Sequence, residues 1–429
     1  MLKYLWTVIQ DLFVVVTLVT WIHALLGRLY DKTGRRFSIA GICVGVVASA
    51  ALAVVKGTTN KIISSHWNHY IFAFISVFSL LFVVLCLIFG RREDGKRRLG
   101  GTLLCLSGAG LSAAHIFYAL PGVMLYPFNF NTMGEGYLSS YYMTRLAGWL
   151  LALLLLLVYS RTLYRCALHI KPLGTLSALL CGGVLVNLFY SGGRFFAPWV
   201  TRAKWLKWPV RYSKESHGLI GGWLSITVDH SMLFIWLIVL LAAVSLIICF
   251  VQNTKVTEPW DNPAQHRKLR ARNRSFRRTA CVAFVGLILF TVCLTVVKDY
   301  DTRVIELSAP ETFTVDGDRI LVPMDSVNDF HLHRFEYTTE NNVNVRWIVV
   351  RKPNSAAYGV GLDACDVCGN AGYYERNGLV VCRRCDVVMN TNTIGFKGGC
   401  NPIPLSYEVD EGNLVFALAD ILAGEKEFK

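Results

Sequence analysis

Eight apolar stretches of roughly membrane-spanning length fill the first 298 residues and constrain the fold more than any other feature. A helix needs about 20 mostly apolar residues to cross a bilayer, and lipid satisfies none of its backbone polar groups. The stretches are bounded by charge, glycine or proline and lie at roughly 6–27, 38–56, 69–90, 101–125, 143–164, 173–191, 229–251 and 279–297. The sequence therefore predicts an α-helical polytopic membrane domain over residues 1–298, with about eight transmembrane helices.

The first stretch is expected to remain in the chain as an anchor. It is longer than the apolar core of a signal peptide and has no small-residue cleavage site. The composition agrees with a membrane protein, because 17% of the residues are charged, against about 25% in soluble proteins.

Positive charge alternates between the loops and sets the expected orientation. The loops at 28–37, 91–98, 161–171 and 252–278 are rich in Lys and Arg, whereas 126–142 has none and 57–68 has only Lys61. Cytoplasmic loops of membrane proteins carry an excess of Lys and Arg. We therefore expect a multi-pass protein with both termini outside the cytoplasm.

One loop departs from this pattern. Residues 192–228 carry six Lys and Arg, yet the expected orientation places them outside. Their sequence "RFFAPWVTRAKWLKWPVRY" interleaves tryptophan with basic residues, which is typical of a segment lying on a membrane surface. Such a segment can also bind nucleic acid, but this one lies on the wrong side of the membrane. We expect membrane lipid as its partner and no nucleic acid.

Three polar residues in or beside the apolar stretches are candidates for function, because ionisable groups are costly in a membrane. They are Asp11, His23 and His115. His115, in the middle of "LSAAHIFYALPG", could ligate haem or relay a proton, and His23 is a second candidate for these roles. The alternative is that His115 is a buried histidine bonded to a neighbouring helix.

The sequence changes character after Lys298. Residues 1–298 hold 31 Lys and Arg against 9 Asp and Glu, whereas residues 299–429 hold 12 against 20. Short runs such as "TFTVDGDRILVPMDSV" are rich in β-forming residues and are split by Asp-Gly or Asn pairs, which are typical of hairpins. The sequence predicts a small β-rich domain over 299–429, which the topology places outside the cytoplasm.

Two Cys-x-x-Cys pairs lie in this second part of the chain, Cys365 with Cys368 and Cys382 with Cys385. The C-x2-C-x13-C-x2-C spacing predicts a tetrahedral four-thiolate site suited to zinc or iron. Cys400 follows as an extra ligand, a resolving thiol or a structural cysteine. In an oxidising compartment the alternatives are two disulfides or a purely structural zinc site.

Two histidines precede the cysteine pairs in "DFHLHRFEY". A single strand would place His331 and His333 on the same face. They could be further metal ligands or part of an exposed strand face.

Four segments of the second part resemble the FtrD-like family of membrane iron–sulfur proteins: "LHRFEY", "VRWIVVRKP", "GLDACDVCGNAGYY" and "VVCRRCDVVMNTNTIGFKGGCNPIPL". The resemblance covers about 300–420, and the multi-span form of the family fits the first part by architecture. It implies a metal site whose ligands are Cys365, Cys368, Cys382 and Cys385, with Cys400 as a fifth participant and His333 as a weaker candidate. The implied cofactor is an iron–sulfur cluster or a mononuclear iron, with copper or zinc as alternatives.

Members of that family are associated with bacterial high-affinity iron uptake, beside an iron permease and a periplasmic iron-binding protein. The resemblance therefore implies a metal or redox protein of the bacterial inner membrane, which transfers electrons or handles iron (or copper) at the outer face. It could be an electron carrier or part of a metal reductase, and the membrane half could pass electrons from quinone or haem. A thiol–disulfide oxidoreductase and a zinc-stapled docking module of a transport complex are the alternatives.

Overall fold

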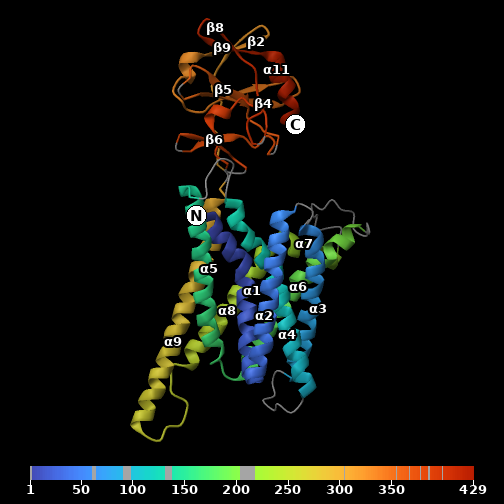
Figure 1. The fold of residues 1–429 in the computed structure, drawn as a ribbon, viewed down its shortest axis with the longest axis vertical. Helices are drawn as coiled ribbons and strands as arrows, with labels where there is room; N and C mark the ends of the chain where they lie inside the picture. The colour runs from blue at the N-terminus through green and yellow to red at the C-terminus, as the bar shows by residue number, and fades with distance from the viewer. Residues whose placement is uncertain are drawn as a thin grey trace. The chain divides into compact units, whose positions relative to one another are not determined.

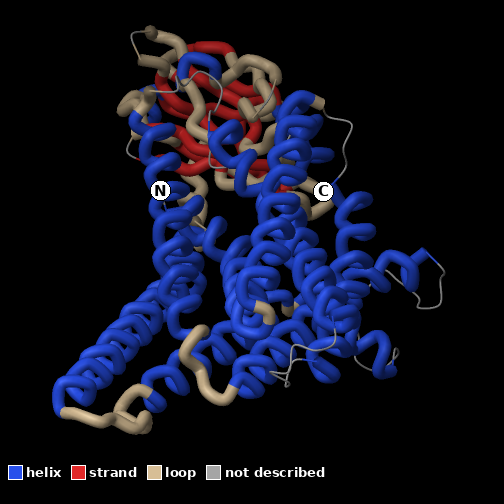
Figure 2. Tube along the Cα trace, turned by 60° about the horizontal axis from the view of Figure 1, so that its bottom comes forward, coloured by secondary structure: helices blue, strands red, loops and turns tan. Residues whose placement is uncertain are grey.

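The structure is a computed structural model that describes residues 2–59, 64–89, 98–130, 138–202, 218–303, 305–353, 355–366, 368–376, 378–384, 387–398 and 400–429. The chain divides into two compact units, Met1–Asp301 and Thr302–Lys429, and each is described by itself. The first unit is built from helices and the second mainly from short strands (Figure 1 and Figure 2).

Eight helices in the described part of the chain are long and apolar enough to cross a membrane, as predicted. They are α1 (Leu2–Leu29), α2 (Asp31–Thr58), α3 (Ser64–Phe89), α4 (Arg98–Leu125), α5 (Ser140–Ala167), α6 (Leu173–Arg202), α8 (Ser231–Gln252) and α9 (Pro263–Val292). Shorter helical segments accompany them: η1 (Tyr126–Phe130), α7 (Gly218–Asp229), the π-helical η2 (Cys293–Val297) and α10 (Lys298–Asp301).

The first helix lies at the centre of the bundle. α1 is buried along most of its length and packs against α2, α4, α5, α6 and α8. Its buried hydroxyls have partners, since Thr17 donates to the Phe13 carbonyl at 2.8 Å and the Thr20 hydroxyl lies 2.9 Å from that of Ser160. A helix that is apolar on most sides is expected in such a position.

Small residues let α2 and α4 pack closely. A Cβ added to Gly41 would lie 2.4 Å from the Ala109 carbonyl oxygen, and one added to Gly45 would lie 2.9 Å from Ile116 Cβ. Glycines of this kind allow helix backbones to approach each other in membranes. The contact fixes the position of α4, the helix that carries His115.

Two helices, α9 and α6, extend furthest beyond the predicted spans. α9 begins at Pro263 because the Asn262 side chain accepts a hydrogen bond of 2.8 Å from the Gln265 amide, and proline suits the first helical turn. Much of the basic stretch expected as a loop is therefore helical. α6 continues to Arg202, into the expected surface segment 192–228, and α7 covers its end; residues 203–217 lie outside the described residues.

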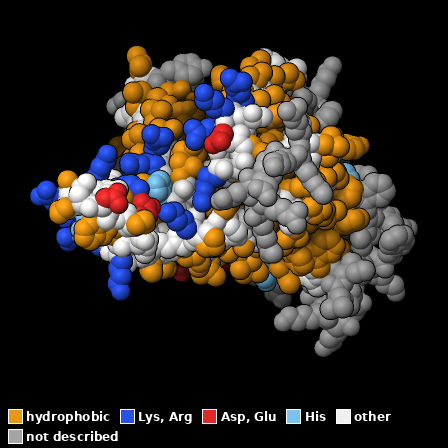
Figure 3. All heavy atoms as spheres, turned by 90° about the horizontal axis from the view of Figure 1, so that it is seen from below, with side chains coloured by type: hydrophobic (Ala, Val, Ile, Leu, Met, Phe, Trp, Pro, Cys, Tyr) orange, Lys and Arg blue, Asp and Glu red, His pale blue; other side chains and the backbone are white. Residues whose placement is uncertain are grey.

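Lys and Arg side chains gather at one end of the helical unit (Figure 3). That end carries the connections between α1 and α2, between α5 and α6, and between α8 and α9. Arg28 there donates to the carbonyls of Ala167 at 3.2 Å and Ile170 at 2.6 Å, at and just beyond the end of α5. A cation at a helix C-terminus interacts favourably with the helix dipole, so this basic residue also stabilises the fold.

Antiparallel strands form the second unit, which confirms the predicted small β-rich domain. One sheet has the order β1 (Thr314–Asp316), β2 (Arg319–Pro323), β9 (Asn413–Ala417) and β8 (Glu408–Asp410). A second has the order β3 (His333–Thr338), β4 (Asn344–Arg351) and β5 (Tyr358–Leu362), and a hairpin joins β6 (Tyr373–Arg376) to β7 (Leu379–Cys382). The short helices are η3 (Met324–Val327), η4 (Thr391–Thr393), α11 (Leu418–Ala423) and η5 (Gly424–Glu427).

Two apolar cores stabilise this unit. In the larger, Trp347 is fully buried, and its ring centroid lies 5.3 Å from Phe313, 5.6 Å from Phe335 and 6.1 Å from Phe416. The smaller core lies at the β6–β7 hairpin and contains three cysteines of the two pairs, Cys365, Cys368 and Cys382. The cysteines are thus held apart from the main core.

Candidate metal centre

The first Cys-x-x-Cys forms a tight turn that leads towards β6. Cys365 and Gly369 exchange backbone hydrogen bonds of 3.1 and 2.9 Å across it, and Gly369 adopts a φ of +65°, which favours glycine. Within the turn, the Cys368 amide donates to the Cys365 sulfur at 3.1 Å. Hydrogen bonds to the sulfur atoms are among the features that tune a thiolate-bound metal.

The second Cys-x-x-Cys begins at the end of β7, beside the first. Cys382 lies opposite Tyr373 in the β6–β7 register, and its amide donates to the Val387 carbonyl at 3.0 Å, so the chain turns back there. Arg384 in this turn donates to the Cys368 carbonyl at 3.2 Å and joins the two turns. Cys385, the predicted fourth ligand, lies outside the described residues.

Tyr373 connects the fifth cysteine to this hairpin. Its hydroxyl donates to the Cys400 carbonyl at 2.6 Å, and the partly buried Cys400 packs against the cysteine cluster. Burial raises the pKa of the Tyr373 hydroxyl, and the neighbouring Cys365 raises it further. The hydroxyl therefore stays protonated at neutral pH and remains a hydrogen-bond donor.

A buried ionic cluster holds the chain on either side of the first turn. Asp363 is fully buried, and its carboxylate accepts hydrogen bonds from Arg334 at 3.1 Å, from Arg346 at 3.2 Å and from the Tyr373 amide at 2.7 Å. Arg334 is 1% exposed and also donates to the Tyr373 carbonyl. The cluster therefore positions Cys365, two residues after Asp363, against β6.

By residue type, the cysteines of the two pairs suit a thiolate-bound metal. The three described cysteines of the two pairs are at most 6% exposed, and soft sulfur ligands select zinc, iron–sulfur clusters or copper(I). Within the described ranges, no three His, Cys, Asp or Glu side chains are grouped so that they could hold a metal ion. Cys365, Cys368, Cys382 and Cys400 therefore form no such group by themselves, and the four-thiolate site stays a prediction. No disulfide joins the cysteines that the structure describes.

The strands that lead into the cysteine pairs lie in a region that matches a protein-family model. Residues 327–428 match the family described as membrane iron-sulfur containing protein FtrD-like. This match confirms the resemblance seen in the sequence and runs from before β3 to α11 and η5, so that β1, β2 and the long helices lie outside it. No curated protein and no solved structure matches the chain. Residues 327–428 are called the FtrD-like region below.

The ionic cluster of the FtrD-like region is not evident from the sequence alone. Arg346 lies in the mostly apolar strand β4, Arg334 follows His333 in β3, and Asp363 directly precedes "ACDVC". A charged residue in such a strand is a signal, because a buried charge needs a partner. The identity of that partner depends on strand pairing, since Asp363 lies 29 residues from Arg334 and 17 from Arg346.

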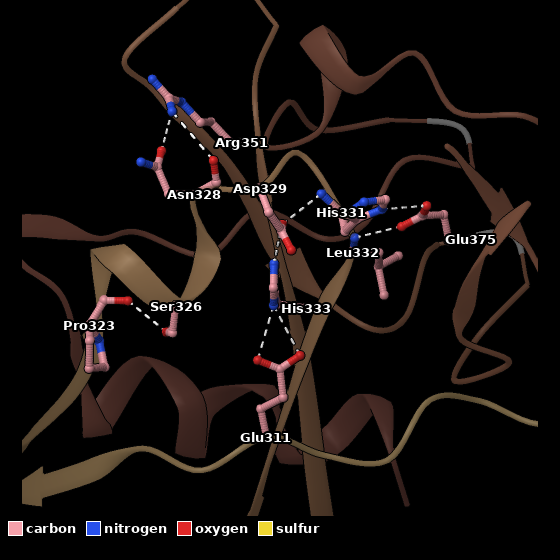
Figure 4. Close-up of polar contacts among 10 residues, drawn as sticks. All are labelled: Glu311, Pro323, Ser326, Asn328, Asp329, His331, Leu332, His333, Arg351 and Glu375. Atoms are coloured by element: carbon pink, nitrogen blue, oxygen red, sulfur yellow. Dashed lines mark hydrogen bonds and ion pairs between the residues drawn. The ribbon is translucent and has the colours of Figure 1, made fainter. Parts of the chain in front are cut away.

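His333 lies at the start of β3 between two carboxylates (Figure 4). Its Nδ1 lies 3.0 Å from Glu311 Oε1, and its Nε2 lies 2.7 Å from Asp329 Oδ1. Both ring nitrogens are therefore engaged, and a metal could bind either one only after one of these contacts breaks. A role for His333 as a ligand stays a prediction.

His331, which precedes β3, contacts Glu375 of the β6–β7 hairpin (Figure 4). Its Nδ1 lies 2.8 Å from Glu375 Oε1, and the same carboxylate accepts a hydrogen bond from the Leu332 amide at 2.9 Å. The Glu375 carboxylate raises the pKa of His331, because it stabilises the imidazolium. The charged contact is therefore complete below the ordinary histidine pKa and is lost as the pH rises through the raised value.

Substitution of the carboxylate tests this pH dependence. We expect Glu375→Gln to lower the pKa of His331 towards the ordinary value of about 6.5, measured by NMR titration of labelled histidine. Glu336→Gln is a control in the same unit and should leave the titration unchanged. An identical His331 titration in Glu375→Gln and the unmodified protein would contradict the contact.

The two intramembrane histidines occupy different surroundings. His115 is buried in α4, and its Nδ1 lies 2.8 Å from the Leu111 carbonyl oxygen. His23 lies in α1, with its Nδ1 3.0 Å from the Ser38 hydroxyl. His115 lines a cavity of the helical unit and His23 does not, so the structure does not bring these two candidates together.

Proposed function

We propose that this chain is a membrane-bound metal and redox protein of a bacterial iron (or copper) uptake system, acting at the outer face of the inner membrane. One observation carries the proposal. Arg384, between Cys382 and Cys385 in the sequence, bonds to the first Cys-x-x-Cys turn in a region that matches a membrane iron-sulfur family, on a chain whose described part has eight long apolar helices. Because a cation permease would need carboxylates deep in the membrane and the spans hold few, a role beside a separate permease is favoured.

The metal would be held by the thiolates of Cys365, Cys368, Cys382 and Cys385, with Cys400 as a further participant. A bound iron–sulfur cluster or mononuclear iron would supply one-electron redox chemistry. The Cys368 amide stabilises negative charge on the Cys365 sulfur, and burial keeps water from the thiolates. Such surroundings tune the reduction potential of a metal.

The expected topology agrees with a centre outside the cytoplasm. The basic end of the helical unit would face the cytoplasm, and both termini would lie on the other side. The partners would then be membrane lipid, an iron permease and a periplasmic iron-binding protein. A reporter that works only in the cytoplasm can be fused to the carboxy terminus. Activity of that fusion would contradict this orientation.

Metal analysis and an absorption spectrum of the purified full-length protein, before and after dithionite, test the proposal. We expect thiolate-to-iron or thiolate-to-copper bands that bleach on reduction. These bands and the metal should be lost in Cys365→Ser and in Cys382→Ser. Cys43→Ser is the matched control, because Cys43 is an exposed cysteine of α2.

Two other results would replace the proposal. A colourless protein with one zinc would indicate that zinc only stabilises the FtrD-like region, which would then serve to dock a partner of a transport complex. A protein without metal, and with a reversible disulfide between Cys365 and Cys368 or between Cys382 and Cys385, would make it a thiol–disulfide oxidoreductase.

A further inference from the structure

A cavity of about 450 Å³ lies within the helical unit and is lined mainly by α1, α3, α4, α6 and α8. Pockets of about 300–1,000 Å³ hold cofactors and other small ligands. The lining runs from Gln10 to Val15 on α1 and from Ser231 to Ile238 on α8, so the cavity extends over roughly one to two helical turns. It lies in the half of the bundle nearest the start of α1.

His115 presents an unpartnered nitrogen at this cavity. A carbonyl oxygen can only accept, so the contact to Leu111 places the proton on Nδ1 and leaves a lone pair on Nε2 of the neutral ring. Nε2 is buried and has no hydrogen-bond partner among the described residues, although Asn187 approaches the ring from α6. A histidine that ligates a metal through one nitrogen almost always donates the other N–H to a carbonyl, a carboxylate or water.

Aromatic rings and an open space shape the cavity for a large flat ligand. Neighbouring ring centroids lie 4.9, 6.2 and 5.1 Å apart along a continuous row of four lining residues, Tyr118, Phe72, Tyr190 and Phe234. Gly122 also lines the cavity, and a Cβ added there would meet no atom within 4 Å. Since Gly122 is seven residues after His115, the space lies on the same side of α4.

Two cationic side chains line the cavity as well, Lys56 of α2 and Arg194 of α6. The Arg194 guanidinium lies 5.5 Å from the Tyr190 ring centroid, and its Nε is buried with no hydrogen-bond partner in the described part of the chain. A buried cation in a membrane bundle needs a compensating partner. Asp11 is the one carboxylate among the described residues that line the cavity, and it accepts a hydrogen bond from Tyr126 at 2.7 Å. Two cations against one carboxylate favour a ligand that brings anionic groups of its own.

We propose that this cavity binds haem non-covalently, with His115 Nε2 as the iron ligand. The aromatic row would pack against the porphyrin, and Lys56 and Arg194 would face its two carboxylates. Haem combines a Lewis-acidic iron, a planar ring and anionic groups. A quinol lacks both the iron and the carboxylates. A bare metal cation would be repelled by Lys56 and Arg194. The sequence contains no Cys-x-x-Cys-His motif for covalent attachment. The proposed haem site belongs to the helical unit, and the cysteine pairs belong to the second unit.

The full-length protein, purified in detergent from haem-sufficient cells, tests the site. The readouts are the Soret and α bands and the pyridine haemochrome content of the monodisperse fraction. We expect about one haem per chain, extractable with acidified acetone. In His115→Gly the haem content should fall roughly tenfold or more, since even outer-shell partners of metal ligands alter affinity about 10–100-fold, and added imidazole should restore it.

Three further variants separate ligation from folding. Gly122→Leu should lose haem by filling the open space, whereas His23→Ala, outside the cavity, should keep it. Cys365→Ser should keep the haem bands while losing any thiolate-to-metal band, so that failure of this site and failure of the cysteine centre are distinguishable. A wild-type protein without haem, including one that carries quinone instead, or a His115→Gly variant with the wild-type haem content, would overturn the proposal.

Discussion

Asp363→Ala is expected to destabilise the cysteine-bearing hairpin by about 3–5 kcal/mol, the usual cost of removing one partner from a buried ion pair. The carboxylate is fully buried and accepts hydrogen bonds from two guanidinium groups and the Tyr373 amide. Its loss leaves Arg334, which is 1% exposed, as an uncompensated charge. The expected result is faster amide hydrogen exchange over residues 363–382 in the full-length protein, together with a lower metal content.

Two variants serve as controls for Asp363→Ala. Asp410→Ala removes a carboxylate 3.9 Å from Arg319 in a pair whose side chains are both 63% exposed, so little or no change is expected. Asp363→Asn keeps acceptor capacity without the charge and should give an intermediate effect. Exchange over 363–382 that is as slow in Asp363→Ala as in the unmodified protein would show that the cluster does not hold the first turn.

Trp347→Ala is expected to destabilise the larger core by about 3–5 kcal/mol, as for other large-to-small substitutions of buried aromatic residues. Trp347 is fully buried on β4, and its ring packs against Phe313, Phe335 and Phe416. The substitution leaves a cavity between the two larger sheets. Pulse proteolysis of the full-length protein in increasing urea should show a lower midpoint for cleavage within 302–429.

Trp347→Phe is the matched control for this substitution. The Trp347 indole N–H has no hydrogen-bond partner among the residues that the structure describes, so phenylalanine loses volume but no polar contact. We expect a much smaller decrease in the urea midpoint than for alanine. Equal midpoints for Trp347→Ala and the unmodified protein would mean that this core contributes little to the stability of the unit.

The length of the apolar stretches was sufficient to predict the helical unit, because crossing a bilayer requires long, mostly apolar stretches. The same approach misplaced the start of α9, since its first turns are basic and depend on the Asn262 cap and Pro263. Hairpin signals predicted the β-rich unit. Short-range patterns of this kind are readable because their partners lie within a few residues.

Long-range partners were not predictable in the same way. Arg334 and Arg346 meet Asp363 only after β3, β4 and β5 have paired. Likewise, nothing in the spacing of the spans indicated that His115, Gly122 and Arg194 line one cavity. Such contacts depend on which helix faces lie together, and one sequence does not specify this.

The pairing of β2 with β9 has a practical consequence for anyone who divides this chain. The two strands are in register from Arg319 opposite Ala417 to Pro323 opposite Asn413, and Ile320 and Val322 of β2 are fully buried. Both residues precede position 327, where the family match begins. A fragment cut at 327 would leave one side of β9 bare, and an unpaired strand edge is a template for aggregation. The start of the family match is therefore not a domain boundary. A fragment intended for expression would have to start before Thr314.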